Sequence, residues 1–124
     1  MKLEALVGGS AEVVGPETPL AVAAGVMVDE DVSAVAVVDD RRLVGILTDR
    51  DLTRALAEAD DPKQEPAAAW MSSAPDVLPP DVPVAEAAQW IMETGYRHLP
   101  VMGGDELLGI VDVRDLLWAL TTEG

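Results

Sequence analysis

Two aspartates near the starts of two expected helices carry the chemistry of this chain that is best suited to binding a sugar. Asp51 and Asp115 fall in the first turns of segments expected to be helical at 50–59 and 114–121. An ionised carboxylate accepts two hydrogen bonds in a planar fork, which suits the vicinal hydroxyls of a ribose. Helix capping combined with charge–dipole stabilisation is the other interpretation, and the residue types alone leave both open.

The residues next to each aspartate determine whether the helix start would attract or repel a phosphate. Free backbone N–H groups at a helix start favour an anion. Thr48 can donate a hydrogen bond to a phosphate oxygen, whereas an ionised Asp112 cannot and would repel it. Arg50 and Arg114 stand at the two helix starts, where they either reach a phosphate or pair with neighbouring acids, and pairing is the favoured interpretation.

These residues belong to an internal repeat. Residues 13–60 and 77–124 align without a gap at an offset of 64, and fifteen of the 48 pairs are identical. The identities concentrate in 43–52 and 107–116, which contain both aspartates. A repeat of this length implies two similar lobes related by an approximate two-fold axis, and grooves between such lobes are places where small ligands bind.

Each copy has the same expected order of elements: a short extended segment, a helix, a β-hairpin and a second helix. A capping oxygen and a proline place the first helices at Thr18-Pro19 and at Asp81-Val82-Pro83. Gly95 is expected to end the second of them. Their apolar stripes, with spacings of three, are expected to be Ala21, Ala24 and Met27 in one copy and Ala85, Ala88 and Ile91 in the other.

The expected strands are largely apolar without strict alternation, as is typical of strands buried on both faces. They are Ala34–Val38, Leu43–Thr48, Leu99–Met102 and Leu107–Val111, with extended segments at Val13-Val14 and Val77-Leu78 and a short helix at Ala67–Met71. We expect residues 1–61 to form repeat 1, residues 62–66 a linker and residues 67–124 repeat 2. The expected fold class is α/β (α+β), with the two pseudo-two-fold repeats packed sheet to sheet.

Composition excludes several classes of function. The 124 residues carry a net charge of −15, so nucleic acid and anionic membranes are poor partners. The absence of cysteine excludes disulfides, thiolate metal sites and cysteine nucleophiles. No apolar run approaches the roughly 20 residues of a membrane span, and no signal peptide is visible, so we expect a cytoplasmic protein. A salty cytoplasm and a GC-rich genome explain the acidity equally well.

The order of elements and three short motifs resemble the cystathionine-beta-synthase (CBS) domain over essentially the whole chain. The motifs are Gly-Ile-(Leu/Val)-x-x-Arg-Asp-Leu, starting at Gly45 and at Gly109, and Leu-Pro-Val at Leu99. A tandem pair of these domains is called a Bateman module. The resemblance implies two small lobes that bind an adenine-containing ligand in the clefts between them and pass the signal to an attached or partner protein.

The expected function is therefore a stand-alone regulatory module with no obligate cofactor. The expected ligand is AMP, ADP, ATP or another adenosyl compound, with Mg²⁺ as an optional companion. The alternative is a dimeric structural or interaction module without a nucleotide, which the acidic surface and the imperfect second motif favour. An enzyme is not expected, because nothing resembles a nucleophile with its base, and no catalytic or metal-binding residue is assigned.

The ligand motif of the family is a glycine, then a threonine or serine, then an aspartate three residues later. The matching positions are Gly45, Thr48 and Asp51 in the first copy and Gly109, Asp112 and Asp115 in the second. Because the second copy has an aspartate in place of the hydroxyl, we expect an asymmetric pair. The site with Thr48 should accept a phosphorylated nucleotide more readily, and the site with Asp112 should be empty or take a less anionic adenosine derivative.

Basic and aromatic residues complete the set of candidates. In the family, basic residues before the Leu-Pro-Val strand face a phosphate, and Arg97 and His98 fall there. A surface arginine and a structural histidine are the alternative; if both residues instead face the cleft with Asp112, they offset its repulsion and reverse the asymmetry. Trp70, Trp90 and Trp118 are most simply core residues, but a flat homodimer with Trp90 or Trp118 at the contact is the expected assembly.

Overall fold

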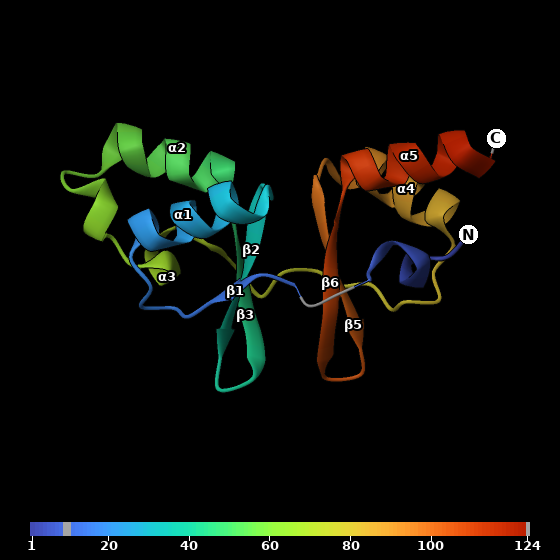
Figure 1. Ribbon diagram of the computed structural model, residues 1–124, viewed down its shortest axis with the longest axis horizontal. Helices are drawn as coiled ribbons and strands as arrows, with labels where there is room; N and C mark the ends of the chain where they lie inside the picture. The colour runs from blue at the N-terminus through green and yellow to red at the C-terminus, as the bar shows by residue number, and fades with distance from the viewer. Residues whose placement is uncertain (9–10, 124) are drawn as a thin grey trace. The chain divides into compact units, whose positions relative to one another are not determined.

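The computed structural model describes residues 1–8 and 11–123 and forms two compact units (Figure 1). The α2 unit comprises Glu12–Pro75, and the α5 unit comprises Met1–Ala11 together with Asp76–Gly124. In each unit the main helices cover one face of a β-hairpin (Figure 1). The expected mixed α/β class is confirmed. No helix in the described part of the chain is long and apolar enough to cross a bilayer.

The α2 unit is built on a four-stranded sheet in the order β1-β2-β3-β4. Strand β1 runs parallel to β2, and the other neighbours are antiparallel. Its elements are β1 (Val13–Val14), α1 (Leu20–Glu30), β2 (Ala34–Asp39), β3 (Arg42–Thr48), α2 (Asp49–Glu58), the 3₁₀ turn η2 (Pro62–Gln64), α3 (Ala67–Trp70) and β4 (Ser72–Ser73). Residues 62–66, expected to link the repeats, lie within this unit.

The α5 unit repeats this plan around a two-stranded antiparallel sheet. Its elements are the 3₁₀ turn η1 (Leu3–Leu6), α4 (Val84–Thr94), β5 (His98–Gly103), β6 (Glu106–Asp112) and α5 (Val113–Glu123). The extended segment expected at Val77-Leu78 is represented by a single parallel bridge from Leu78 to Val101. Both hairpins shift register at equivalent places, after Val37 and after Val101.

The buried faces of the first helices share Met27 and Ile91 with the expected stripes but differ from them at the two earlier positions. Helix α1 buries Leu20, Ala23 and Met27, and α4 buries the equivalent Val84, Ala87 and Ile91. Ala21 and Ala85 are exposed, so the expected stripes were wrong at these positions. The spacing of three and then four follows the 3.6-residue period, and the larger side chains of Leu20 and Val84 enter the cores.

The expected capping oxygens of these two helices were also wrong. Pro19 and Pro83 occupy the N-cap positions without a side-chain cap, and the Thr18 hydroxyl instead accepts from the backbone N–H of Gly15 at 2.9 Å. The C-terminal ends of α1 and α4 agree better with the expectation. Gly95 ends α4 with a φ of 80°, and Asp31 ends α1 in the same left-handed region with a φ of 54°. Aspartate tolerates this conformation better than most residues, which explains how α1 ends without glycine.

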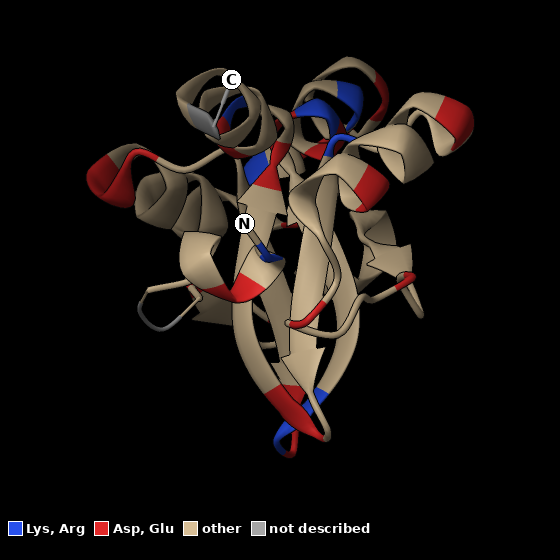
Figure 2. Ribbon diagram, turned by 90° about the vertical axis from the view of Figure 1, so that its right-hand side faces the viewer, with Lys and Arg blue, Asp and Glu red and all other residues tan. Residues whose placement is uncertain are grey.

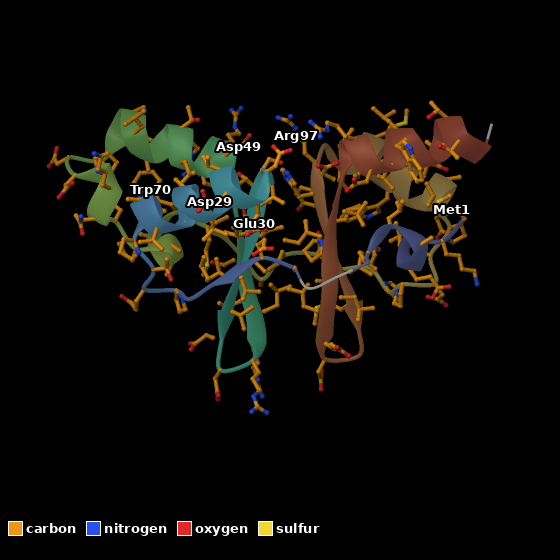
Figure 3. The ribbon with its side chains drawn as sticks, in the orientation of Figure 1. Met1, Asp29, Glu30, Asp49, Trp70 and Arg97 are labelled. Carbon is orange, nitrogen blue, oxygen red and sulfur yellow. The ribbon has the colours of Figure 1, made fainter. Side chains whose placement is uncertain are left out.

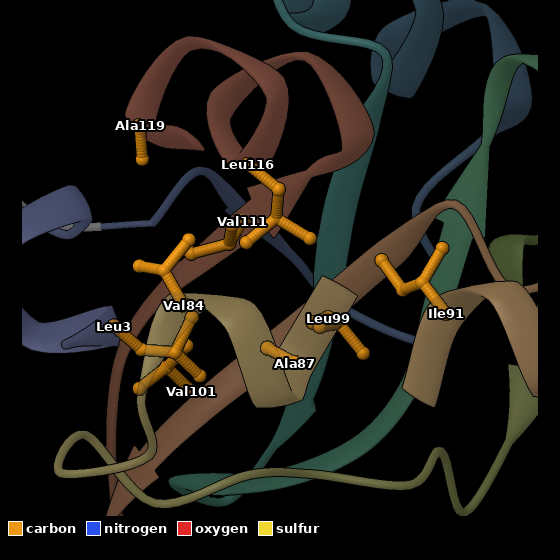
Figure 4. Close-up of a cluster of buried hydrophobic side chains, with 9 residues drawn as sticks. All are labelled: Leu3, Val84, Ala87, Ile91, Leu99, Val101, Val111, Leu116 and Ala119. Atoms are coloured by element: carbon orange, nitrogen blue, oxygen red, sulfur yellow. The ribbon is translucent and has the colours of Figure 1, made fainter. Parts of the chain in front are cut away.

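The N-terminal segment completes the α5 unit as residues 65–68 complete the α2 unit. Backbone N–H groups of Leu3 and Glu4 donate to the carbonyls of Val82 and Pro80 at 2.9 Å, and Val84 N–H donates to Met1 C=O at 2.9 Å. The equivalent bonds of the α2 unit join positions that are offset by 64 residues from these. The backbone N–H groups of Ala67, Ala68 and Leu20 donate to the carbonyls of Thr18, Pro16 and Glu65, respectively. Leu3 is fully buried in the core drawn in Figure 4.

Charged residues lie mainly on helices, loops and hairpin turns, and the strands are mostly uncharged (Figure 2). The tryptophans differ in burial. Trp70 and Trp90 are partly buried against the cores of their units, as core packing requires. Trp118 is 57% exposed, so the interpretation of this residue as core was wrong.

Candidate functional site

Asp51 is held at the start of α2 by a reciprocal capping arrangement with Thr48. Thr48 N–H donates to Asp51 Oδ2 at 2.9 Å, and the Thr48 hydroxyl donates to the same oxygen at 3.1 Å. In return, Asp51 N–H donates to Thr48 Oγ1 at 3.3 Å. Asp51 is only 6% exposed, and its capping bonds satisfy helix-terminal donors that would otherwise be unpaired.

Arg54 completes this cluster, although no sequence motif pointed to it. Its Nη1 lies 3.0 Å from Asp51 Oδ1, and its guanidinium lies over the ring of Trp70, 5.5 Å from the centroid. Trp70 Nε1 in turn donates to Glu65 Oε1 at 3.3 Å. The available signal was the spacing of three from Asp51, which places two side chains on the same helix face.

Asp112 and Asp115 form the equivalent arrangement at the start of α5, with a carboxylate in place of the threonine hydroxyl. Asp112 N–H donates to Asp115 Oδ2 at 3.0 Å, and Asp115 N–H donates to Asp112 Oδ1 at 2.9 Å. Trp118 stands where Arg54 stands in the α2 unit, so α5 offers Asp115 no cation at this spacing. Two acidic side chains therefore share one helix start.

The environment of Asp115 makes its carboxyl easier to protonate than that of an ordinary aspartate. Burial raises the pKa of the Asp115 carboxyl above its ordinary value, and the charge of the Asp112 carboxylate raises this pKa further. The hydrogen bond from Asp112 N–H and the charge of Arg114 act in the opposite direction and lower it. The net shift is upward because desolvation is the largest effect.

Arg97 and His98 lie at the same end of their hairpin as Asp112. His98 is directly opposite Asp112 in the β5–β6 register, and Arg97 C=O accepts from Val113 N–H at 3.1 Å. Figure 3 labels Arg97 just before β5 and Asp49 at the start of α2. The two basic residues thus belong to the unit that carries the paired carboxylates.

Arg50 and Arg114 are exposed at their helix starts. Arg114 is close enough for its charge to lower the pKa of Asp115. Within residues 1–8 and 11–123, Arg54 and Asp51 form an ion pair, whereas neither Arg50 nor Arg114 does. The favoured interpretation, that these arginines pair with neighbouring acids, thus finds an electrostatic effect of Arg114 on Asp115 but no ion pair of either arginine in this part of the chain.

The motif glycines have a packing role in each hairpin. A Cβ on Gly45 would collide with the side chain of Met71 and would lie 2.9 Å from the carbonyl oxygen of Ser72. A Cβ on Gly109 would lie 2.7 Å from Cγ1 of Val7, which is the equivalent of Met71. Each glycine thus allows the flanking segment of its unit to lie directly on strand β3 or β6.

These helix starts combine acceptors, donors and partial positive charge in the way that a phosphorylated sugar requires. The carboxylates can accept from hydroxyls, and the partial positive charge of the helix start favours an anion. At α2 the backbone N–H groups of Asp49, Arg50 and Asp51 are already bonded to acceptors of the protein. Among the described residues there is no group of three or more histidine, cysteine, aspartate or glutamate side chains suited to hold a metal ion.

Comparison with known proteins identifies relatives of the chain in several organisms. It is 34% identical over 104 residues to the CBS domain-containing protein YhcV of Bacillus subtilis, covering 83% of this chain and 74% of the relative. It is also 34% identical over 110 residues to an uncharacterized 17.7 kDa protein of Acidianus ambivalens. That match covers 87% of this chain and 66% of the relative, so the chain spans slightly less than two thirds of its length.

Solved structures share the fold over almost the full length. The CBS domain protein PAE2072 from Pyrobaculum aerophilum, complexed with AMP, superposes with a TM-score of 0.85 at 23% identity, covering 98% of this chain and 99% of that one. The CBS domain pair of protein MJ0100, in complex with 5′-methylthioadenosine and S-adenosyl-L-methionine, gives a TM-score of 0.89 at 19% identity, covering 100% and 98%.

The sequence pattern of the CBS domain matches this chain twice, at residues 10–58 and at residues 67–122. Each match contains one of the helix starts described above, and together they cover most of the chain. The expected resemblance is thereby confirmed, and this chain belongs to the CBS domain family as a tandem pair.

Proposed function

We propose that this tandem pair binds an adenine nucleotide or a related adenosyl compound, with Asp51 and Asp115 accepting hydrogen bonds from ribose hydroxyls. The observation that carries the proposal is the duplicated pair of polar side chains at a helix start, repeated with the same hydrogen-bond pattern in both units. The AMP and S-adenosyl-L-methionine complexes of similarly folded proteins support this class of ligand.

The phosphate preference of the two sites is a further part of the proposal. At α2 the Thr48 hydroxyl and the first backbone N–H groups are already bonded, so Arg50 and the positive end of the helix would attract a phosphate there. At α5 the carboxylate of Asp112 opposes the phosphate, while Arg97, His98 and Arg114 attract it. Because His98 lies opposite Asp112 and Arg97 precedes it, these cations offset the repulsion by Asp112. We therefore assign the phosphorylated nucleotide to the α5 unit and an uncharged or cationic adenosyl ligand to the α2 unit. A Mg²⁺ ion would enter with the phosphates, because the described residues contain no site of their own for it.

A regulatory role in the cytoplasm follows as the accompanying proposal. Binding would change the affinity of the module for a partner protein, and no catalytic step is assigned to it. The relatives of similar length include YhcV, which is named only for its CBS domain. We propose a homodimer as the working assembly, since Trp118 and Leu117 are both exposed on α5 and large apolar side chains at helix surfaces are typical of protein contacts.

The alternative function is a dimeric interaction module without a nucleotide. The hydrogen bonds of Asp51 and Asp115 favour it, because both carboxylates already act as helix caps. The exposed apolar residues of α4 and α5 are consistent with it as well. The two functions differ in whether adenosyl compounds bind at all.

Thermal unfolding with a ligand panel separates these functions. The panel comprises ATP, ADP, AMP, adenosine, NAD, S-adenosylmethionine and cyclic dinucleotides. A ligand at 100 times its dissociation constant stabilises the folded protein by about 2.7 kcal/mol. Asp51→Ala and Asp115→Ala should each abolish part of the ligand-induced shift, measured relative to the same variant without ligand.

Asp49→Ala is the matched control for this experiment. Asp49 lies in the same first turn of α2 and is exposed, so its removal changes the charge without touching the Thr48–Asp51 pair. A shift with no member of the panel would favour the interaction module. Equal shifts in wild type and in both aspartate variants would refute the assignment of the carboxylates to the ligand.

A further inference from the structure

The carboxylate of Asp51 has too few free acceptor positions to receive a ribose in its present state. It offers about four lone-pair positions on its two oxygens. The Thr48 N–H and hydroxyl both donate to Oδ2, and Arg54 donates to Oδ1 at 3.0 Å. One position remains, whereas a vicinal diol donates two hydrogen bonds. At least one of the three existing bonds must therefore open when a ribose binds.

Arg54 is the partner that can leave with least penalty. The Thr48 N–H is fixed in the backbone at the helix start and would lose its acceptor, and the Thr48 hydroxyl also caps Asp51 N–H. The Arg54 side chain is 50% exposed and reaches Asp51 through Nη1. Once released, its guanidinium is hydrated by the surrounding water, so no buried charge is left without a partner.

The same guanidinium connects Asp51 to the segment that closes the α2 unit. It lies over Trp70, which contacts the core of this unit and donates to Glu65. Glu65 C=O accepts from Leu20 N–H at 2.9 Å, and Pro66 forms a bridge with Pro19. A change at Asp51 thus reaches the 65–70 segment through a single side chain.

We propose that the ligand of the α2 unit displaces Arg54 from Asp51, and that Trp70 loses its stacked cation in the same event. The inference rests on the proposed binding of a ribose by Asp51. It adds the route by which ligand binding at Asp51 affects Trp70. The device belongs to the α2 unit, because Trp118 replaces the arginine at the equivalent position of α5. Arg54 is therefore a competitor of the ligand that sets its affinity, and Trp70 is the reporter.

The test uses adenosine as the probe, because it is uncharged and cannot interact with Arg54 through a phosphate. Calorimetry in an Asp115→Asn background removes the contribution of the α5 unit. Arg54→Met should tighten adenosine binding by up to about fivefold, the range for an ion pair of this exposure. Raising the salt concentration should tighten binding to the arginine form and leave Arg54→Met unchanged. Arg42→Met, an exposed hairpin position, removes the same charge and should leave the affinity unchanged.

Fluorescence follows the second half of the proposal. In a Trp90→Phe/Trp118→Phe protein, Trp70 is the remaining tryptophan, and adenosine should change its emission with Arg54 present but not in Arg54→Met. Adenosine binding that is weaker in Arg54→Met, or an equal Trp70 response in both proteins, would overturn this inference and leave the proposed function standing. Absence of binding for adenosine and AMP in wild type would instead refute the proposed function, and the role of Arg54 with it.

Discussion

Leu3→Ala is expected to destabilise the α5 unit although the residue lies near the chain terminus. The Leu3 side chain is 0% exposed and packs in a core that includes Val84, Val101 and Ala119 (Figure 4). Its backbone N–H is bonded to Val82 C=O at 2.9 Å, so the side chain has a fixed position. Replacing a buried leucine with alanine removes the transfer free energy of its methyl groups and leaves a cavity.

The magnitude follows from these two contributions. Leucine-to-alanine substitutions in cores cost about 2–5 kcal/mol, and full burial with a fixed backbone places Leu3 near the middle of that range, at about 3 kcal/mol. With a urea dependence of about 2 kcal/mol per molar, the midpoint of the α5 unit should fall by about 1.5 M. Leu3→Met retains most of the volume and should cost less than about 1.5 kcal/mol.

Urea unfolding followed by circular dichroism and by hydrogen exchange measures the effect in each unit. Leu56→Ala is the matched control, since the same atoms are removed from a side chain that is 74% exposed on α2. It should change stability by no more than about 0.5 kcal/mol. Equal midpoint shifts for Leu3→Ala and Leu56→Ala would show that the N-terminal segment does not belong to the core of the α5 unit.

Three further substitutions test the site and its surroundings. Because burial and Asp112 raise the pKa of Asp115, the folded state binds more protons than the unfolded state, and stability falls as pH rises from 3.8 through the higher pKa of the folded state. Asp112→Thr should lower this pKa, as measured by carboxyl NMR titration. Gly45→Ala should cost about 1–3 kcal/mol through overpacking, whereas Gly25→Ala, with nothing within 4 Å of its Cβ, should not destabilise the protein in thermal unfolding. Trp118→Ser should shift sedimentation toward the monomer if the proposed dimer uses α5, and an unchanged dimer would exclude this residue from the contact.

Much of the hairpin structure was predictable because strand and turn signals agree in both copies. The apolar runs that include Val35 and Val101 became buried strands, and Gly95 ended α4 as expected. A two-fold repeated signal carries more information than either copy, since a chance pattern is not expected to recur at a constant offset. The order of elements and the family were therefore accessible without coordinates.

The phase of the first helices was not predictable, because α1 is apolar on more than one face. Val22 and Val28 are exposed on it, although their residue type is typical of the core. Counting apolar positions at a spacing of three then identifies several equally good stripes. The buried stripe is selected by the larger side chains at positions such as Leu20, whose packing against the sheet depends on the tertiary structure.

The contacts of Arg54 could not be predicted from the sequence for a different reason. The aspartates were found from their place near a helix start, which is a local property of the sequence. Contact of Arg54 with Trp70 joins α2 to α3, and no local pattern specifies how these helices meet. The spacing of three from Asp51 would have predicted the ion pair of Arg54 with Asp51 but not the contact of Arg54 with Trp70.

The division of the α5 unit between the two ends of the sequence imposes an order on folding during synthesis. Residues 12–75 form a contiguous unit, which has all its parts as soon as Pro75 has left the ribosome. Leu3 must wait for Val84, Val101 and Ala119, and at 5–20 residues per second this delay is on the order of 10 s. During that interval the segment 1–11 exposes apolar side chains to chaperones and proteases. A substitution that weakens the docking of segment 1–11 would hinder the last step of folding rather than the first.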